Sequence, residues 1–167
     1  FLDHYFKANG MPVRNKIFGN IARLSAWGSR MAPLSNWAAN SPVGKIMSDK
    51  LLGVHPKRRM PQFVRETFPK WFKSRPAETP TTREREGTSS IVSDTVVLLN
   101  DTYMNYNYPQ VGKATVALLE AAGFKVELAD ALCCGRPMIS KGLLDDAASN
   151  AVHNIRLLHA YASNGIP

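Results

Sequence analysis

The spacing of hydrophobic residues predicts that the first part of the chain consists of short helices. Ile17, Ile21, Leu24 and Trp27 recur at intervals of three and four, which places them on one apolar face of a single helix. Residues 41–53 form a second helical stretch, with serine and proline at its start and glycine just past its end. We therefore expect short helices interrupted by proline and glycine.

Residues 55–76 are rich in cations, aromatics and prolines, so we expect an extended arm with one or two turns of helix. The cations alternate with Phe63, Phe68, Trp71 and Phe72. This mixture suits an interface with anionic lipid headgroups, and it also suits single-stranded nucleic acid, whose bases stack on aromatic rings. The interpretation we favour is that the aromatics pack against domains outside this chain while the cations stay in water.

A polar stretch rich in Pro, Thr and Ser, residues 76–90, is typical of a linker. Beyond it, residues 95–99 and 124–128 have the apolar or alternating pattern of short strands. A polar, aromatic loop and a helix that begins at Pro109 separate these strands. The helix carries Val111, Ala114, Leu118 and Ala122 along one face, and we expect Gly123 as its C-terminal cap.

After the second strand come a turn that contains both cysteines of the chain, a helix over about residues 143–162, and the start of a third strand at 165–167. This alternation implies parallel strands joined by right-handed crossovers. The predicted fold class is α/β. Residues 91–167 form part of a doubly wound parallel sheet, and residues 1–75 form a basic segment of short helices before it.

Composition narrows the classes of protein to which the chain can belong. With 44% hydrophobic residues it can bury a core, and no apolar run is long enough to span a bilayer. The net charge of +8 is uneven, because residues 1–90 hold 16 Lys and Arg against 6 Asp and Glu, whereas residues 91–167 hold 5 against 7. An anionic partner is therefore expected for the first part.

The two ends of the chain and its cysteines indicate what kind of protein it comes from and where that protein is located. The start lacks both an initiator Met and the pattern of a signal peptide, and the end stops where a strand would begin, so we expect an internal piece of a longer protein. Two adjacent cysteines do not form a secreted disulfide framework, which favours a reducing, cytoplasmic location. The four histidines lie far apart or on different helix faces and are expected at the surface.

The adjacent Cys133 and Cys134 are the candidate site, because ligands of open α/β sheets bind beyond the carboxyl ends of the strands. Gly135 relieves the backbone beside the thiols, and Pro137 fixes the exit of the turn. Iron and zinc favour thiolates, but an iron–sulfur cluster needs about four ligands and this chain offers two. The residues alone leave three interpretations open: packed small hydrophobes, metal ligands or a dithiol redox pair.

The stretches "CCGRPMISKGLLDDA" and "DTYMNYNYPQVGKATVALLEAAGFKVEL" resemble the cysteine-rich CCG domain. This domain occurs in iron–sulfur subunits of anaerobic glycerol-3-phosphate dehydrogenase, in glycolate and lactate oxidation proteins and in heterodisulfide reductase. The chain looks most like the iron–sulfur C-terminal half of fused FAD-linked oxidases, which include D-lactate and other D-2-hydroxyacid dehydrogenases. Residues 4–37 resemble the segment that follows the ferredoxin-like motifs of these oxidases, so the resemblance covers nearly the whole chain.

The resemblance implies an electron relay. FAD in an upstream domain would oxidise a D-lactate-like 2-hydroxyacid, and iron–sulfur centres would pass the electrons to an acceptor such as quinone. Cys133 and Cys134 match the family's metal-binding cysteines, whereas Thr102 stands where many relatives have a further cysteine. The implied partners are the remaining domains or subunits of the enzyme, with peripheral contact at the inner face of the membrane.

The resemblance implies no catalytic residue in this chain, so the piece alone is expected to be inactive. Nucleic acid is not expected as a partner on this interpretation. The alternative is a protein of another class, a basic binding module for anionic lipid, nucleic acid or an acidic protein, attached to a structural α/β domain.

Overall fold

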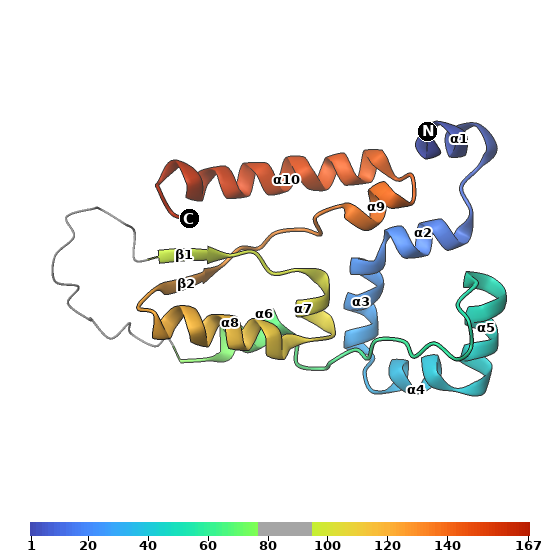
Figure 1. The fold of residues 1–167 in the computed structure, drawn as a ribbon, viewed down its shortest axis with the longest axis horizontal. Helices are drawn as coiled ribbons and strands as arrows, with labels where there is room; N and C mark the ends of the chain where they lie inside the picture. The colour runs from blue at the N-terminus through green and yellow to red at the C-terminus, as the bar shows by residue number, and fades with distance from the viewer. Residues whose placement is uncertain (77–94) are drawn as a thin grey trace.

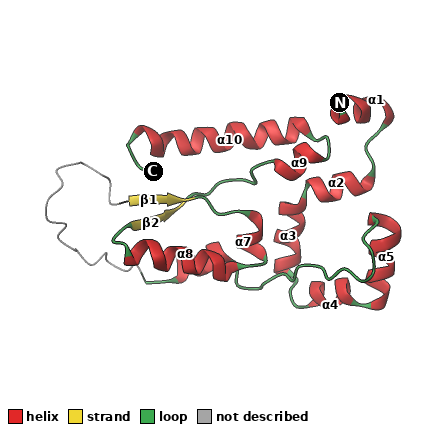
Figure 2. Cartoon of the chain, viewed as in Figure 1, coloured by secondary structure: helices red, strands yellow, loops and turns green. Residues whose placement is uncertain are grey.

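A computed structural model describes residues 1–76 and 95–167 of the chain, and helices dominate both ranges (Figures 1 and 2). The predicted linker, residues 76–90, lies outside the described residues except for Pro76. The elements in chain order are α1 (Leu2–Asn9), α2 (Val13–Gly19), α3 (Ile21–Arg30), α4 (Leu34–Asn40), α5 (Pro42–Leu52), α6 (Phe68–Ser74), β1 (Thr95–Leu98), α7 (Thr102–Tyr106), α8 (Pro109–Ala121), β2 (Lys125–Leu128), α9 (Arg136–Ser140) and α10 (Leu144–Ser163).

The two strands β1 and β2 form a parallel pair, with Thr95 opposite Lys125 and Leu98 opposite Leu128. Helix α8 connects them, and α8 and α10 lie on opposite sides of the sheet (Figure 1). A parallel pair needs such a crossover helix, because a tight hairpin can join only antiparallel strands. The predicted α/β class and both predicted strands are confirmed, and the sheet in the described residues has two strands.

The predicted third strand at residues 165–167 is not formed, so this prediction is wrong for the described residues. Pro167 nevertheless lies beside β1, because its carbonyl accepts a hydrogen bond of 2.8 Å from the Val97 amide. Alternate residues of a parallel strand bond to opposite sides, and the Leu98 carbonyl bonds towards β2, to the amide of Ala129. Pro167 therefore lies on the edge of β1 that faces away from β2.

The hydrophobic core joins the arm to the sheet. Phe68 at the start of α6 is fully buried and clusters with Val116 of α8 and Val126 of β2. Gly112 makes this packing feasible, because a Cβ there would lie 2.6 Å from the Phe68 ring. At the other end of α6, Arg75 pairs with Glu120 at 2.5 Å and stacks over Phe72 at 4.2 Å. The arm is thus part of the core of the α/β unit.

This packing corrects our interpretation of the arm, because its aromatics pack within the chain. The side-chain amide of Asn36 bonds to both backbone groups of Phe63, each at 2.8 Å. The Val64 amide donates to the Tyr106 carbonyl at 2.9 Å, which ties the arm to α7. The prediction of one or two turns of helix in the arm is confirmed by α6, whose N-cap is the Thr67 hydroxyl.

The single helix predicted through Ile17 and Trp27 is two helices, α2 and α3, which meet at Asn20. Leu24 and Trp27 are exposed, and the side of α3 that packs carries the buried Ser25 and Ser29. Apolar spacing pointed to the wrong face because small residues are needed where the arm crosses α3. A Cβ on Gly28 would clash with the Phe63 ring, and the Ser29 hydroxyl donates to the Val64 carbonyl.

The capping predictions for the next helix are confirmed. In α5, the Ser41 hydroxyl accepts a hydrogen bond from the Gly44 amide at 3.0 Å, and Pro42 occupies the first helical position. Gly53 follows the helix with φ +61°, a left-handed conformation that glycine adopts without steric cost.

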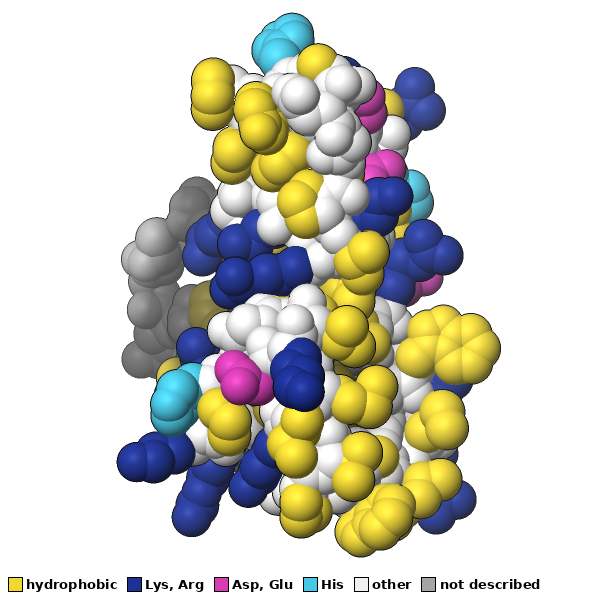
Figure 3. All heavy atoms as spheres, turned by 90° about the vertical axis from the view of Figure 1, so that its right-hand side faces the viewer, with side chains coloured by type: hydrophobic (Ala, Val, Ile, Leu, Met, Phe, Trp, Pro, Cys, Tyr) yellow, Lys and Arg dark blue, Asp and Glu magenta, His cyan; other side chains and the backbone are white. Residues whose placement is uncertain are grey.

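Large apolar side chains lie exposed on α4 and α5, and Figure 3 shows them gathered on the lower part of this face with Lys and Arg around them. The most exposed are Leu34, Trp37, Val43 and Leu51. Most surfaces expose some apolar residues, but a contiguous group of this kind is typical of an interaction surface.

The first two helices contact the region around α9 and the start of α10. Lys7 of α1 lies 3.0 Å from both Asp3 and Asp145, and the hydrogen bonds to Asp145 and then Asp3 raise its pKa above the usual lysine value. Gly142 packs against Phe6, and the Asn15 amide donates to the Lys141 carbonyl at 3.4 Å. The basic segment therefore supports the elements that flank the cysteine turn.

Candidate functional site

The turn that carries the cysteines begins where β2 ends and leads into α9, as expected for a ligand-binding edge of a parallel sheet. Cys133 is half-buried and Cys134 is exposed, and both are free thiols. The interpretation of the pair as packed hydrophobes is therefore wrong for Cys134. At least one thiol is accessible to a metal ion or a redox partner from solvent.

Gly135 and Pro137 shape the exit of this turn, as the sequence predicted. Gly135 has φ +80° and serves as the N-cap of α9, and Pro137 lies in the first turn of that helix. A Cβ on Gly135 would lie 3.3 Å from that of Ala147 on α10, so the glycine allows both the left-handed conformation and the close approach of α10. The turn is therefore held close to α10 directly beside the thiols.

The loop after β1, predicted as irregular, contains the short helix α7. Asp101 caps it by accepting a hydrogen bond from the Met104 amide at 2.7 Å, and Thr102 is its first residue. The sequence shows an aspartate at a position where it can cap a helix. A helix of only five residues is too short to show a periodic apolar pattern, so periodicity did not predict α7. Thr102 is half-buried, and its hydroxyl is a poor ligand for iron.

Asn150 and Asn154 of α10 contact the cysteine turn, and sequence reasoning missed both. The Asn150 amide donates to the Cys133 carbonyl at 3.1 Å, and Asn154 bonds to Leu132. The two asparagines are four residues apart and therefore lie on the same face of α10. This shared face is the one sequence signal that could have pointed to a common partner, the cysteine turn.

The donor atoms present fit one part of a metal site. Thiolates are the preferred ligands of iron–sulfur clusters, and the two cysteines are consecutive residues of a turn in which one thiol is half-buried and the other is exposed. Among the described residues, no group of three or more His, Cys, Asp or Glu is arranged to hold a metal ion. This chain therefore supplies two candidate ligands, and a complete cluster site requires further donors.

Two open hollows of the described structure lie away from the thiols. One, of about 290 Å³, is lined by residues of α1 and by residues 142–146. The other, of about 420 Å³, lies between α3, α6 and α7 and is lined by Ala26, Ser29, Arg30, Arg65, Thr67, Lys70 and Tyr106. The second hollow has three cations and no acidic residue in its lining.

The turn, α7 and α10 all fall within residues 102–166, which match the family model for CCG, described as a cysteine-rich domain. Residues 102–166 are therefore similar to the CCG cysteine-rich domain. The resemblance noted in the sequence is thereby confirmed for this part of the chain, and the matched residues include both cysteines and the asparagines that contact their turn.

Curated relatives extend the similarity beyond the CCG domain. The chain is 27% identical over 157 residues to one subunit of the anaerobic glycerol-3-phosphate dehydrogenase of Escherichia coli K12, a match that covers 93% of this chain and 37% of the relative. It is 39% identical over 59 residues to one subunit of the CoM/CoB fumarate reductase of Methanothermobacter marburgensis, covering 35% of this chain and 12% of that protein.

The chain thus spans little more than a third of the length of the first of these relatives. No solved structure matches the chain significantly. Within the described residues, no helix has the length and hydrophobicity that crossing a bilayer requires.

Proposed function

We propose that the chain is an electron-transfer segment of a FAD- and iron–sulfur-containing oxidoreductase, with Cys133 and Cys134 as metal ligands. The observation that carries this proposal is the partly exposed pair of free thiols on a glycine-shaped turn at the carboxyl edge of a parallel sheet, within the residues that match the CCG family model. The relatives, a dehydrogenase subunit and a reductase subunit, support a redox role.

The residues of the chain have defined tasks in this proposal. Cys133 and Cys134 would bind iron together with donors from other parts of the protein. An iron–sulfur centre held there would accept and release electrons one at a time. Gly135 keeps the turn close to α10, and Thr102 leaves the loop after β1 without a thiolate. No substrate group is needed from this chain, because oxidation of the donor would take place at FAD in another domain.

The substrate we propose is a D-lactate-like 2-hydroxyacid, with a quinone as acceptor. To test this, the full-length protein is purified anaerobically and mixed with a soluble quinone analogue and D-lactate, L-lactate or sn-glycerol 3-phosphate. We expect quinone reduction with D-lactate and at least about tenfold slower reduction with the other two donors.

Reduction with glycerol 3-phosphate alone would overturn the hydroxyacid assignment while leaving the electron-transfer role intact. No reduction with any donor, in protein that contains flavin, would contradict that role.

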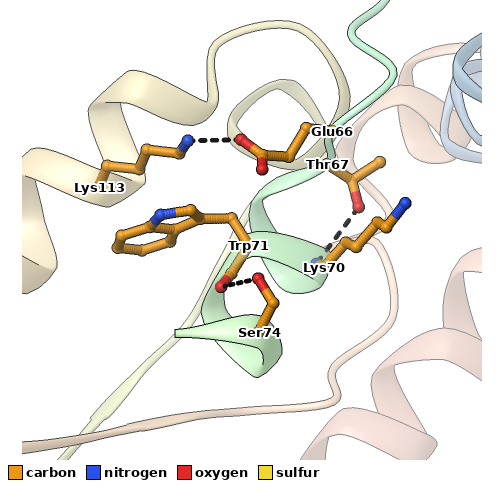
Figure 4. Close-up of polar contacts among 6 residues, drawn as sticks. All are labelled: Glu66, Thr67, Lys70, Trp71, Ser74 and Lys113. Atoms are coloured by element: carbon orange, nitrogen blue, oxygen red, sulfur yellow. Dashed lines mark hydrogen bonds and ion pairs between the residues drawn. The ribbon is translucent and has the colours of Figure 1, made fainter. Parts of the chain in front are cut away.

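A second candidate function, binding to an anionic lipid surface, is favoured by the basic hollow between α3, α6 and α7. Arg30, Arg65 and Lys70 make no ion pair with any described residue. Glu66, next to Arg65, pairs instead with Lys113 at 2.6 Å, and Figure 4 shows this pair above Trp71 with Lys70 pointing away. The exposed apolar side chains of α4 and α5 would add contacts at the headgroup level.

This binding predicts a charge dependence that vesicles can measure. Each cation near an anionic surface contributes about 1 kcal/mol, so Arg65→Gln/Lys70→Gln should weaken binding to phosphatidylglycerol vesicles roughly 30-fold. The control Lys125→Gln/Arg156→Gln removes the same charge from two residues that do not line the hollow, and it should have a much smaller effect. Equal losses in both variants, or tighter binding to single-stranded DNA than to vesicles, would contradict a lipid site at the hollow.

A further inference from the structure

The backbone of the cysteine turn lacks the support that strands and helices give their own residues. At its start, the Ala129 amide bonds to Leu98 at 3.2 Å, and at its end the Gly135 carbonyl accepts from Ile139 at 2.9 Å. Between them, residues 130–134 form no backbone–backbone hydrogen bond in the described structure. A loop held only at its ends would be free to reorient its peptide groups, and with them the two thiols.

Two side-chain amides of α10 take the place of these missing bonds. Asn154 Oδ1 accepts a hydrogen bond of 2.8 Å from the Leu132 amide, and its Nδ2 donates to the Leu132 carbonyl at 3.0 Å. This double contact is the pairing that a neighbouring strand would offer. Asn150 Nδ2 donates to the Cys133 carbonyl at 3.1 Å and also lies 3.7 Å from Met138 Sδ.

We propose that Asn150 and Asn154 are positioning residues for the thiols, and that this amide clamp holds the turn in the conformation that binds metal. The inference rests on the proposed metal-binding function of Cys133 and Cys134. Because α10 is a long helix, its two amides are a more rigid reference than the turn itself. A metal site needs its ligands held in advance, since donors that must first be ordered bind the metal more weakly.

The clamp also sets the direction of the peptide between the two cysteines. A trans peptide is planar, with its carbonyl and amide pointing to opposite sides. Since Asn150 holds the Cys133 carbonyl towards α10, the Cys134 amide points away from α10 and bonds to no described residue. Hydrogen bonds from backbone amides to cluster sulfurs tune reduction potentials, so loss of the clamp should alter both the occupancy and the potential of the centre.

The test uses the intact protein in two states, iron-loaded and after anaerobic removal of iron. In the iron-free state, hydrogen exchange of the Leu132 amide is measured in the wild type and in Asn150→Leu/Asn154→Leu, because this amide is the one in the turn that donates to the clamp. We expect exchange at least about tenfold faster in the variant, since Asn154 Oδ1 no longer accepts its hydrogen bond. The control His153→Leu changes an exposed residue of the same helix and should leave exchange unchanged.

In the iron-loaded state, iron content, the electron paramagnetic resonance spectrum and the midpoint potential of the same variants are compared. We expect at least twofold less iron in Asn150→Leu/Asn154→Leu and a shifted potential in the centres that remain. Asn154→Asp keeps the acceptor for the Leu132 amide but loses the donor, so it serves as a milder variant if the double change fails to fold. It should shift the potential in the same direction.

Unchanged exchange would overturn the clamp itself. Faster exchange with unchanged iron, spectrum and potential would show a purely structural role and would also overturn the positioning proposal. If Cys133→Ser/Cys134→Ser likewise leaves iron unchanged, the metal-binding function has failed, and the exchange measurement still decides whether the amides hold the turn.

Discussion

Replacing Phe68 with alanine should lower the free energy of unfolding by about 3–5 kcal/mol, the usual loss for a large aromatic removed from a core. Phe68 is fully buried between the sheet and α8, and it connects the basic arm to the α/β unit. The neighbouring Trp71 and Phe72 are only partly buried and cannot fill the cavity without leaving Arg75, which stacks over both rings. Total stabilities of about 5–15 kcal/mol make this loss severe.

Urea denaturation followed by circular dichroism measures the change. The matched control is Leu118→Ala on α8, whose side chain is 71% exposed and whose loss should change stability by no more than about 0.5 kcal/mol. Equal losses in the two variants would contradict the core described here. An undiminished stability of Phe68→Ala would show that the arm does not pack on the sheet.

Replacing both cysteines should abolish electron transfer through this segment while leaving oxidation of the donor intact. In Cys133→Ser/Cys134→Ser, two adjacent thiolates become hydroxyls, which are poor ligands for iron. In the full-length protein, flavin reduction by D-lactate in the first turnover should keep its rate, because the substitutions leave the proposed flavin domain unaltered. The rate of electron transfer to the external acceptor should fall by at least about tenfold. Changing a residue that only supports a metal ligand typically lowers activity by that factor, and removing the ligands themselves should lower it further.

Stopped-flow absorption separates these two half-reactions. The control Ser140→Ala removes an exposed hydroxyl of α9 and should leave both rates unchanged. If acceptor reduction in the cysteine variant keeps the wild-type rate, the cysteine turn does not lie on the electron path.

Local sequence signals predicted those elements whose partners lie nearby in the chain. The cap at Ser41, the glycine at 53, the helix from Pro109 and the parallel strands follow from turn chemistry and periodicity, and the structure confirms them. The helix from Pro109 also shows the limit of this reasoning. Its recognised apolar positions include the exposed Val111 and Leu118, while Val116 packs on the sheet, because α8 is apolar on more than one side.

Features that depend on distant segments were not predictable in this way. The buried side of α3 carries Ser25 and Ser29, because the arm crosses it closely and needs small residues there. At the candidate site, the glycine and proline around the thiols were found from local chemistry. The asparagines at 150 and 154 were not, because their partners lie about twenty residues earlier in a turn without periodicity.

The proposed function requires Cys133 and Cys134 to bind iron. Its most direct test is the iron and acid-labile sulfide content of the full-length protein, purified without oxygen, compared with that of Cys133→Ser/Cys134→Ser. We expect the variant to lose the iron and sulfide of one cluster while any clusters bound elsewhere keep theirs. Identical iron and sulfide in the two proteins would contradict it.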